Sequence, residues 1–258
     1  RLHRPFRMKK LVILTAAYGE GHNTAARSLT EAVQAFPGVK VRICDLLDET
    51  FGPVNDLVRK VYITAVNRVP VVWERLYRMI DSGAGVNDSL PLLAPVRQKL
   101  RELLESERPH VVVSTYPLYN PFLQTVQGEF GFRRVTVVTD SITVNSIWYR
   151  YGSDRFIVPN EETAAVMKAN GVPEELLCVL GFPVSPRFAN RPERKEPPAP
   201  GEPWKILYII NSGKQAAPGI VRALLGLPEI ELEVATGRDE ALRQTVEAVV
   251  AESGRNAI

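Results

Sequence analysis

The sequence predicts an α/β protein whose larger part is a doubly wound, mainly parallel sheet. Short β-branched apolar runs alternate with longer segments of helical periodicity, a pattern typical of parallel strands joined by right-handed crossovers. The apolar runs contain few polar residues, as expected of strands that are covered on both faces. The chain has 258 residues, 45% hydrophobic and 24% charged, which is an ordinary globular composition with room for one large domain or two smaller ones.

The expected strands of the larger part occupy residues 11–16, 39–46, 111–116, 134–140, 154–159 and 178–182. Helical patterns between them cover residues 23–36, a long stretch within 55–108, and residues 117–130 and 160–171. We expect residues 11–16 to form a central strand of the sheet.

A change of composition at residues 185–204 indicates a linker between two domains. Proline and charge dominate "SPRFANRPERKEPPAPGEPW", so we expect it to be partly extended. The predicted domains are therefore residues 8–184 and residues 205–258.

The second domain repeats the strand–helix pattern after the linker. Its expected strands are 205–211 and 230–237, and its expected helices are 217–227 and 239–254. Such a unit is too small for a complete doubly wound domain, so we expect the start of a second Rossmann-like domain.

Charge and cysteine content limit the class of partner and the compartment. A net charge of +3 is too small to indicate nucleic acid, although a weakly basic surface suits an anionic membrane. Cys44 and Cys178 lie in apolar runs and predict reduced thiols, which favours the cytoplasm. No apolar run approaches the roughly 20 residues of a spanning helix. The basic start "RLHRPFRMKK" leads directly into a strand, so we do not interpret it as a signal peptide.

The turn "YGEGHN" places a histidine where the first strand meets a helix. Gly19 and Gly21 can adopt positive φ and allow a close backbone approach. We expect the helix to begin near His22 or Asn23, where its N-terminus favours an anion and the imidazole can take a proton near neutral pH. The alternative is that His22 only caps the helix or fills the turn. The turn is neither the dinucleotide-binding fingerprint nor a P-loop.

Several motifs in a fixed order carry a family resemblance. They are "GEGHNTAARSL", "CDLLDE", "STYPLYNPFL", the strand end Thr139–Asp140, the downstream Trp148 and "GFPVSPRF". Together they resemble the monogalactosyldiacylglycerol synthase and processive diacylglycerol glucosyltransferase group of glycosyltransferase family 28. The resemblance covers most of residues 10–190.

The resemblance implies a two-domain GT-B fold and a reaction. The N-terminal domain of the family takes the acceptor, and the C-terminal domain holds most of the donor. The implied reaction is an inverting transfer of a hexose from a UDP-sugar to a lipid such as diacylglycerol at a membrane surface. It implies no cofactor and no metal.

The resemblance also assigns candidate site residues in the first domain. The Gly-x-Gly-His turn of the family falls on Gly19, Gly21 and His22, which makes His22 a candidate base facing the acceptor. Glu20 and Asn23 complete this acceptor or phosphate-binding loop. The family's Thr-Asp step falls on Thr139 and Asp140.

Asp140 has two interpretations. As a second catalytic candidate it would orient the acceptor or a neighbouring side chain. The alternative is a polar end to a buried strand.

Ser212, Gly213 and Lys214 form the candidate donor-side loop, within "NSGKQAAPG". It has fewer glycines than the loop of the family. The family's later acidic and glutamine donor contacts would follow residue 258, so we expect little activity of the chain as given.

Residues 55–80 combine apolar positions at helical spacing with an excess of basic residues. They predict an interfacial membrane contact through Trp73, Arg75 and Arg78, with a peripheral location on the membrane. The alternative is a core-facing helix whose arginines extend to solvent.

Other functions are compatible with the same pattern. One is a different GT-B enzyme, either a peptidoglycan-type lipid glycosyltransferase or a sugar-nucleotide epimerase. Another is a non-catalytic module that binds lipid or nucleotide.

Overall fold

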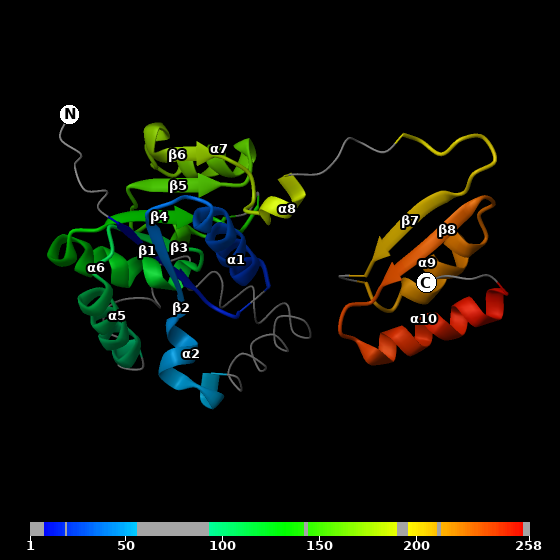
Figure 1. The fold of residues 1–258 in the computed structure, drawn as a ribbon, viewed down its shortest axis with the longest axis horizontal. Helices are drawn as coiled ribbons and strands as arrows, with labels where there is room; N and C mark the ends of the chain where they lie inside the picture. The colour runs from blue at the N-terminus through cyan, green and yellow to red at the C-terminus, as the bar shows by residue number, and fades with distance from the viewer. Residues whose placement is uncertain are drawn as a thin grey trace. The chain divides into compact units, whose positions relative to one another are not determined.

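The computed structural model describes residues 8–18, 20–55, 93–141, 144–189, 196–210 and 213–254. The chain divides into two compact units, Arg1–Arg191 and Pro192–Ile258 (Figure 1). Each unit is described by itself.

The first unit contains a six-stranded, fully parallel sheet in the order β2-β1-β3-β4-β5-β6. Its strands are β1 (Lys9–Thr15), β2 (Val39–Asp45), β3 (Val111–Ser114), β4 (Arg133–Val137), β5 (Arg155–Val158) and β6 (Leu177–Val179). All six predicted strands are therefore present. The strand order reverses between β1 and β3, which creates the switch point where open α/β sheets bind ligands. β1 is an interior strand as expected, although β3 and β4 lie at the middle of the sheet.

Helices connect these strands. They are α1 (Glu20–Gln34), α2 (Leu46–Phe51), α5 (Ala94–Glu107), α6 (Asn120–Phe130), α7 (Glu161–Ala169) and α8 (Pro186–Ala189), with short 3₁₀ turns η2 (Pro117–Tyr119), η3 (Ser146–Trp148) and η4 (Glu174–Leu176). Of the helical stretch predicted within 55–108, the structure describes α5, and residues 56–92 lie outside the described part.

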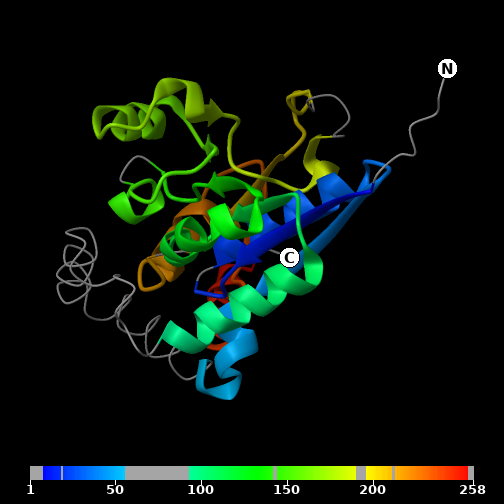
Figure 2. The same cartoon turned by 90° about the vertical axis from the view of Figure 1, so that its left-hand side faces the viewer.

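Both faces of the sheet are covered, as the apolar runs predicted. Val12 and Leu14 of β1 pack into the cluster that α5 and α6 complete. Ile13, between them, points to the opposite face and packs with Ala26 of α1. Figure 2 shows α5 and α6 on one side of β1 and α1 on the other. Because helices cover both faces, a ligand can approach the sheet at the carboxyl ends of its strands.

Two local features differ from the expectations. Residue 46 was expected in a strand, but it begins α2, because the Asp45 carboxylate accepts hydrogen bonds from the backbone N–H groups of Leu47 and Asp48 at 3.1 Å each. The start of the predicted linker is not extended. It forms α8, and Ser185 and Arg187 bind Glu31 of α1 at 2.7 and 3.3 Å.

The second unit consists of β7 (Trp204–Ile209), α9 (Ala217–Leu225), β8 (Ile230–Ala235) and α10 (Glu240–Ser253). The two strands pair in parallel. Val221 of α9, Leu232 of β8 and Val246 of α10 belong to one buried cluster. The predicted strands and helices of this region are thus present, each within a few residues.

Candidate active site at the carboxyl edge of the sheet

Three strand ends meet around His22 in the first unit. His22 lies in the first turn of α1, directly after β1. Thr115 follows β3, and Thr139 follows β4. Because the strand order reverses between β1 and β3, His22 stands at the switch point. Residues far apart in the sequence therefore surround the predicted base.

The His22 ring is held through its Nδ1 atom. Nδ1 lies 2.8 Å from the backbone oxygen of Thr115 and 2.8 Å from the hydroxyl oxygen of Thr139. A carbonyl oxygen can only accept a hydrogen bond, so Nδ1 carries the ring proton. This N–H group forms a bifurcated hydrogen bond, which the hydroxyl oxygen of Thr139 accepts as well. In the neutral ring Nε2 then holds the lone pair. None of the described residues hydrogen-bonds Nε2, which suits it to accept a proton from a substrate.

The environment of His22 favours the neutral imidazole. Burial lowers the pKa of His22 below its usual value, while the Asp140 carboxylate and the hydrogen bond to Thr115 oppose this effect. The ring is half-buried. Near pH 7 the imidazole is therefore mainly unprotonated and competent as a general base.

Aromatic rings border the imidazole. The centroids of the Tyr116 and His22 rings lie 5.0 Å apart in an edge-to-face arrangement. The Trp148 ring lies 6.0 Å from His22 on centroids and is tilted by 37°. Tyr18 stacks on Tyr116 at 6.0 Å. These rings limit the water around the base and strengthen the electrostatic effect of nearby charges.

Asp140 does not accept a hydrogen bond from Nδ1–H of His22, because this group donates to Thr115 and Thr139. Instead its Oδ2 atom accepts a hydrogen bond of 2.7 Å from the indole N–H of Trp148. The carboxylate acts on His22 through space, as its effect on the His22 pKa indicates. Asp140 thus interacts with a neighbouring side chain, and this contact is compatible with both interpretations considered for it.

The remaining residues of the turn have different surroundings. α1 begins at Glu20, earlier than the predicted start near His22 or Asn23. Gly21 lies within α1 without a positive φ, so it does not use the conformational freedom noted for it, and a Cβ there would meet no other atom within 4 Å. Asn23 accepts a 2.9 Å hydrogen bond from the Thr15 hydroxyl, which links α1 to β1. Gly19 lies outside the described residues.

Glu20 is exposed and pairs with Arg27 at 3.3 Å. Its carboxylate faces solvent, and its partner among the described residues is Arg27 and not His22. This makes Glu20 a poor alternative base.

The donor-side loop belongs to the second unit. Gly213 has a φ of 63°, a left-handed conformation that favours glycine. Lys214 Nζ lies 2.6 Å from Oδ2 of Asp239, which also caps α10 by accepting from the Leu242 N–H at 3.1 Å. The ion pair of Lys214 with Asp239 therefore connects the turn after β7 to the turn after β8. Ser212 lies outside the described residues.

The predicted membrane residues Trp73, Arg75 and Arg78 also lie outside the described residues. Among the helices that are described, none is both long and apolar enough to cross a bilayer. The described residues contain no cluster of three or more histidine, cysteine or acidic side chains suited to a metal ion.

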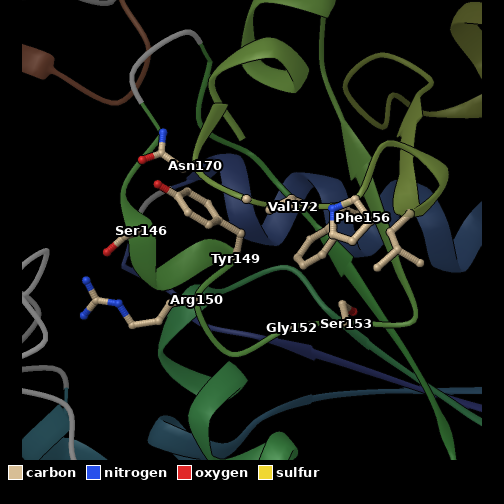
Figure 3. A pocket seen from close by; sticks show the side chains of 11 residues that line it. Ser146, Tyr149, Arg150, Gly152, Ser153, Phe156, Asn170 and Val172 are labelled. Carbon is tan, nitrogen blue, oxygen red and sulfur yellow. The ribbon is translucent and has the colours of Figure 1, made fainter. Parts of the chain in front are cut away.

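A cavity of about 520 Å³ lies apart from His22. Figure 3 shows it beside η3 and the start of β5, with Tyr149, Phe156, Asn170 and Val172 among the residues that line it. Neither His22 nor Asp140 lines it. The cavity is therefore not the candidate active site.

Sequence reasoning did not single out two residues beside the candidate base, Thr115 and Tyr116. They were noted only as part of the motif "STYPLYNPFL" and of the expected strand 111–116. Their positions directly after a buried strand were the available signal, because the ends of parallel strands converge at one edge. Which of them contacts His22 depends on the strand order.

Comparison with curated proteins finds relatives over almost the whole chain. A processive diacylglycerol beta-glucosyltransferase of Bacillus cytotoxicus is 28% identical over 247 residues, which cover 91% of this chain and 62% of that protein. The enzyme of the same name from Bacillus thuringiensis is 28% identical over 255 residues, 93% of this chain and 63% of that protein. The chain therefore spans less than two thirds of the length of these relatives.

Solved structures establish the fold type. A lipopolysaccharide outer core galactosyltransferase, WaaB in its apo form, has a TM-score of 0.55 at 14% identity, covering 96% of this chain and 65% of that one. The UDP-GlcNAc 2-epimerase of Neisseria meningitidis, bound to UDP-GlcNAc, has a TM-score of 0.53 at 10% identity, with 95% and 70% covered. MurG of Acinetobacter baumannii has a TM-score of 0.53 at 14% identity, with 96% and 64% covered. At these identities the likeness shows the GT-B fold alone.

The family model of monogalactosyldiacylglycerol (MGDG) synthase matches residues 22–184. The match begins at the candidate base and includes Thr115, Thr139 and Asp140. It covers more than half of the chain, and the chain therefore belongs to the MGDG synthase family.

Proposed function

We propose that the protein transfers a hexose from a UDP-sugar to a hydroxyl group of a lipid such as diacylglycerol, with inversion at the anomeric carbon. The observation that carries the proposal is the state of His22: Nδ1–H is donated to Thr115 and Thr139, and Nε2 keeps a lone pair. The relatives named as diacylglycerol glucosyltransferases support the choice of a lipid acceptor.

The chemistry follows from the position of this lone pair. Nε2 takes the proton of the acceptor hydroxyl while the acceptor oxygen forms a bond to the anomeric carbon. The bond from that carbon to the diphosphate breaks on the opposite face, and UDP leaves with the electron pair. His22 ends the step as an imidazolium, which the nearby Asp140 charge stabilises. A positioned base typically contributes about 10²–10⁴-fold to such a step.

On the donor side, we assign Gly213 and Lys214 to the UDP diphosphate. Gly213 adopts the left-handed conformation of a tight turn, and the Lys214 ammonium lies at the carboxyl edge of its own sheet. A lysine at such an edge is a suitable point charge for a phosphate. In this proposal transfer needs no metal ion, so EDTA should leave the rate unchanged.

The direct test is a transfer assay with the complete gene product. Vesicles containing diacylglycerol are incubated with UDP-glucose or UDP-galactose, and lipid products are separated and counted. We expect a glycosylated diacylglycerol from one of the two donors. Epimerisation of a UDP-sugar with no lipid product would instead support the epimerase alternative, and binding without turnover would support the non-catalytic module.

We also propose that the protein binds the cytoplasmic face of an anionic membrane peripherally, because a lipid acceptor leaves the bilayer only at high cost. The complete protein should sediment with anionic vesicles at low salt and be released at high salt. Trp73→Ala combined with Arg75→Glu should weaken this binding, and Arg78→Glu should weaken it further.

The matched control for this membrane test lies in the second unit. Trp204→Ala combined with Lys205→Glu also removes one indole and reverses one positive charge, at exposed positions of β7. Equal vesicle binding by the wild type and the Trp73–Arg75 variant would show that residues 55–80 are not the membrane contact.

A further inference from the structure

The indole of Trp148 links the candidate base to the buried part of the sheet. Trp148 is only 1% exposed, which is unusual for a tryptophan at the edge of a ligand site. Its Nε1–H donates to Asp140 Oδ2 at 2.7 Å, a short hydrogen bond to a charged acceptor. The Asp140 carboxylate therefore has a fixed partner.

Trp148 is itself held by a buried polar network. Its backbone oxygen accepts a hydrogen bond of 3.0 Å from the side-chain amide of Asn120, which is fully buried. The backbone oxygen of Asn120 in turn accepts from the Arg134 guanidinium at 3.2 Å, and Arg134 also donates to Tyr151 O at 2.7 Å. Arg134 is 4% exposed, so this network lies within the protein and orders η3.

The titratable groups around His22 come from four elements. Asp140 lies after β4, Tyr116 after β3, and Tyr18 after β1. On α1 itself, Glu20 faces solvent and pairs with Arg27. Among the charged groups of the described residues, Asp140 is the one whose charge raises the pKa of His22. Its position therefore matters to any step that protonates His22.

We propose that Trp148 is a positioning residue: its buried indole N–H holds the Asp140 carboxylate beside the His22 ring, where the carboxylate stabilises the imidazolium that forms when His22 takes the acceptor proton. The inference rests on the proposed function for its catalytic consequence. Its structural part, the control of the His22 charge by Trp148 through Asp140, is independent of any turnover.

The test is an NMR titration of the His22 ring in this chain. The sequence contains three histidines, so the ring carbon signals are few and His22→Gln identifies the relevant one. We expect Asp140→Asn to lower the His22 pKa, because the favourable charge is lost. Trp148→Phe should also lower the His22 pKa, but by less, because the Asp140 carboxylate loses its indole partner and turns toward water. In the Asp140→Asn background, Trp148→Phe should cause no further shift.

Trp204→Phe is the matched control. It makes the same substitution at an exposed tryptophan of the second unit and should leave the His22 titration unchanged. If the His22 pKa is lowered in Asp140→Asn but unchanged in Trp148→Phe, the proposal is overturned. If Trp148→Phe does not fold, the indole N–H signal of Trp148 is followed in Asp140→Asn, where loss of the charged acceptor should shift it. An unshifted signal would also overturn the proposal.

Kinetics of the complete gene product extend the test. Trp148→Phe should lower kcat by about 10-fold, the order expected for one lost hydrogen bond to a charged group, with KM for the UDP-sugar unchanged. A purely structural Trp148 would lower Tm and leave both the His22 titration and kcat per folded molecule unchanged. The NMR result stands even if no transfer is detected, so failure of the inference and failure of the proposed function can be told apart.

Discussion

Two turns occupy the same place in their βα units and differ in what holds their functional side chain. The β1–α1 turn of the first unit presents His22, half-buried and bonded through Nδ1 to Thr115 and Thr139. The β7–α9 turn of the second unit presents Lys214, exposed and paired with Asp239 at 2.6 Å. One side chain is bound by the ends of neighbouring strands, and the other by a surface ion pair.

The difference follows from the chemistry that we assign to each turn. A base needs partial burial and a defined tautomer, and these require contacts from several strands. A phosphate ligand needs a fixed positive charge that stays solvated until the anion arrives. Our proposal therefore assigns proton transfer to the first turn and anion binding to the second.

The largest effect should come from His22→Ala in the complete gene product. It removes the Nε2 lone pair, so turnover should fall by at least about 10²-fold. Affinity for the UDP-sugar and Tm should change little, because the donor loop lies in the second unit and the buried residues of α1 are Ala25, Ala26 and Ser28. Transfer assays, donor titration and thermal melts measure the three quantities. Near-normal turnover would make Asp140 or Glu20 the preferred base, whereas lower Tm with full activity per folded molecule would make His22 structural.

Lys214→Ala should show the opposite kinetic pattern. Loss of one charged contact to the diphosphate should raise KM for the UDP-sugar by about 10-fold and leave kcat nearly unchanged. Tm should not change, because exposed ion pairs contribute little to stability. Arg243→Ala is the control, since it removes an exposed ion pair with Glu240 on α10 of the same unit. A fall in kcat without a change in KM would contradict the assignment of this turn to binding.

The buried state of His22 should also affect stability at low pH. Its pKa is lowered in the folded state, so the unfolded chain binds the proton first as the pH falls below about 6.5. The wild type should therefore lose stability relative to His22→Gln between pH 7.5 and 5. We expect a change of at most on the order of 2–4 °C, which corresponds to about 1 kcal/mol in a domain of this size. A relative gain in wild-type Tm at low pH would show that the His22 pKa is raised.

Glu20→Gln should have the smallest effect. Glu20 is exposed and its pairing with Arg27 is on the surface, so turnover should stay within about 2-fold of the wild type. The pH dependence of kcat should also be unchanged. A large loss of turnover would show that the base in this turn is Glu20.

Much of the first unit could be predicted from local patterns. The six strands were found because apolar runs covered on both faces are recognisable without knowledge of their partners. The start of α2 was missed although Asp45 before Leu46 is a capping signal, because the apolar run continues through it. The start of α1 was placed too late for a similar reason: the glycine at position 21 suggested a turn, but it lies inside the helix.

The order of residues along the chain already showed that a histidine follows the first strand, that an aspartate follows the fourth strand and that a tryptophan comes shortly afterwards. It could not determine which atoms these side chains bind. The partner of His22 is a backbone oxygen 93 residues away, and the partner of Asp140 is the indole of Trp148. Only the tertiary structure decided these contacts, because the strand order selects which strand ends become neighbours, and a hydrogen bond depends on distances that no local pattern encodes.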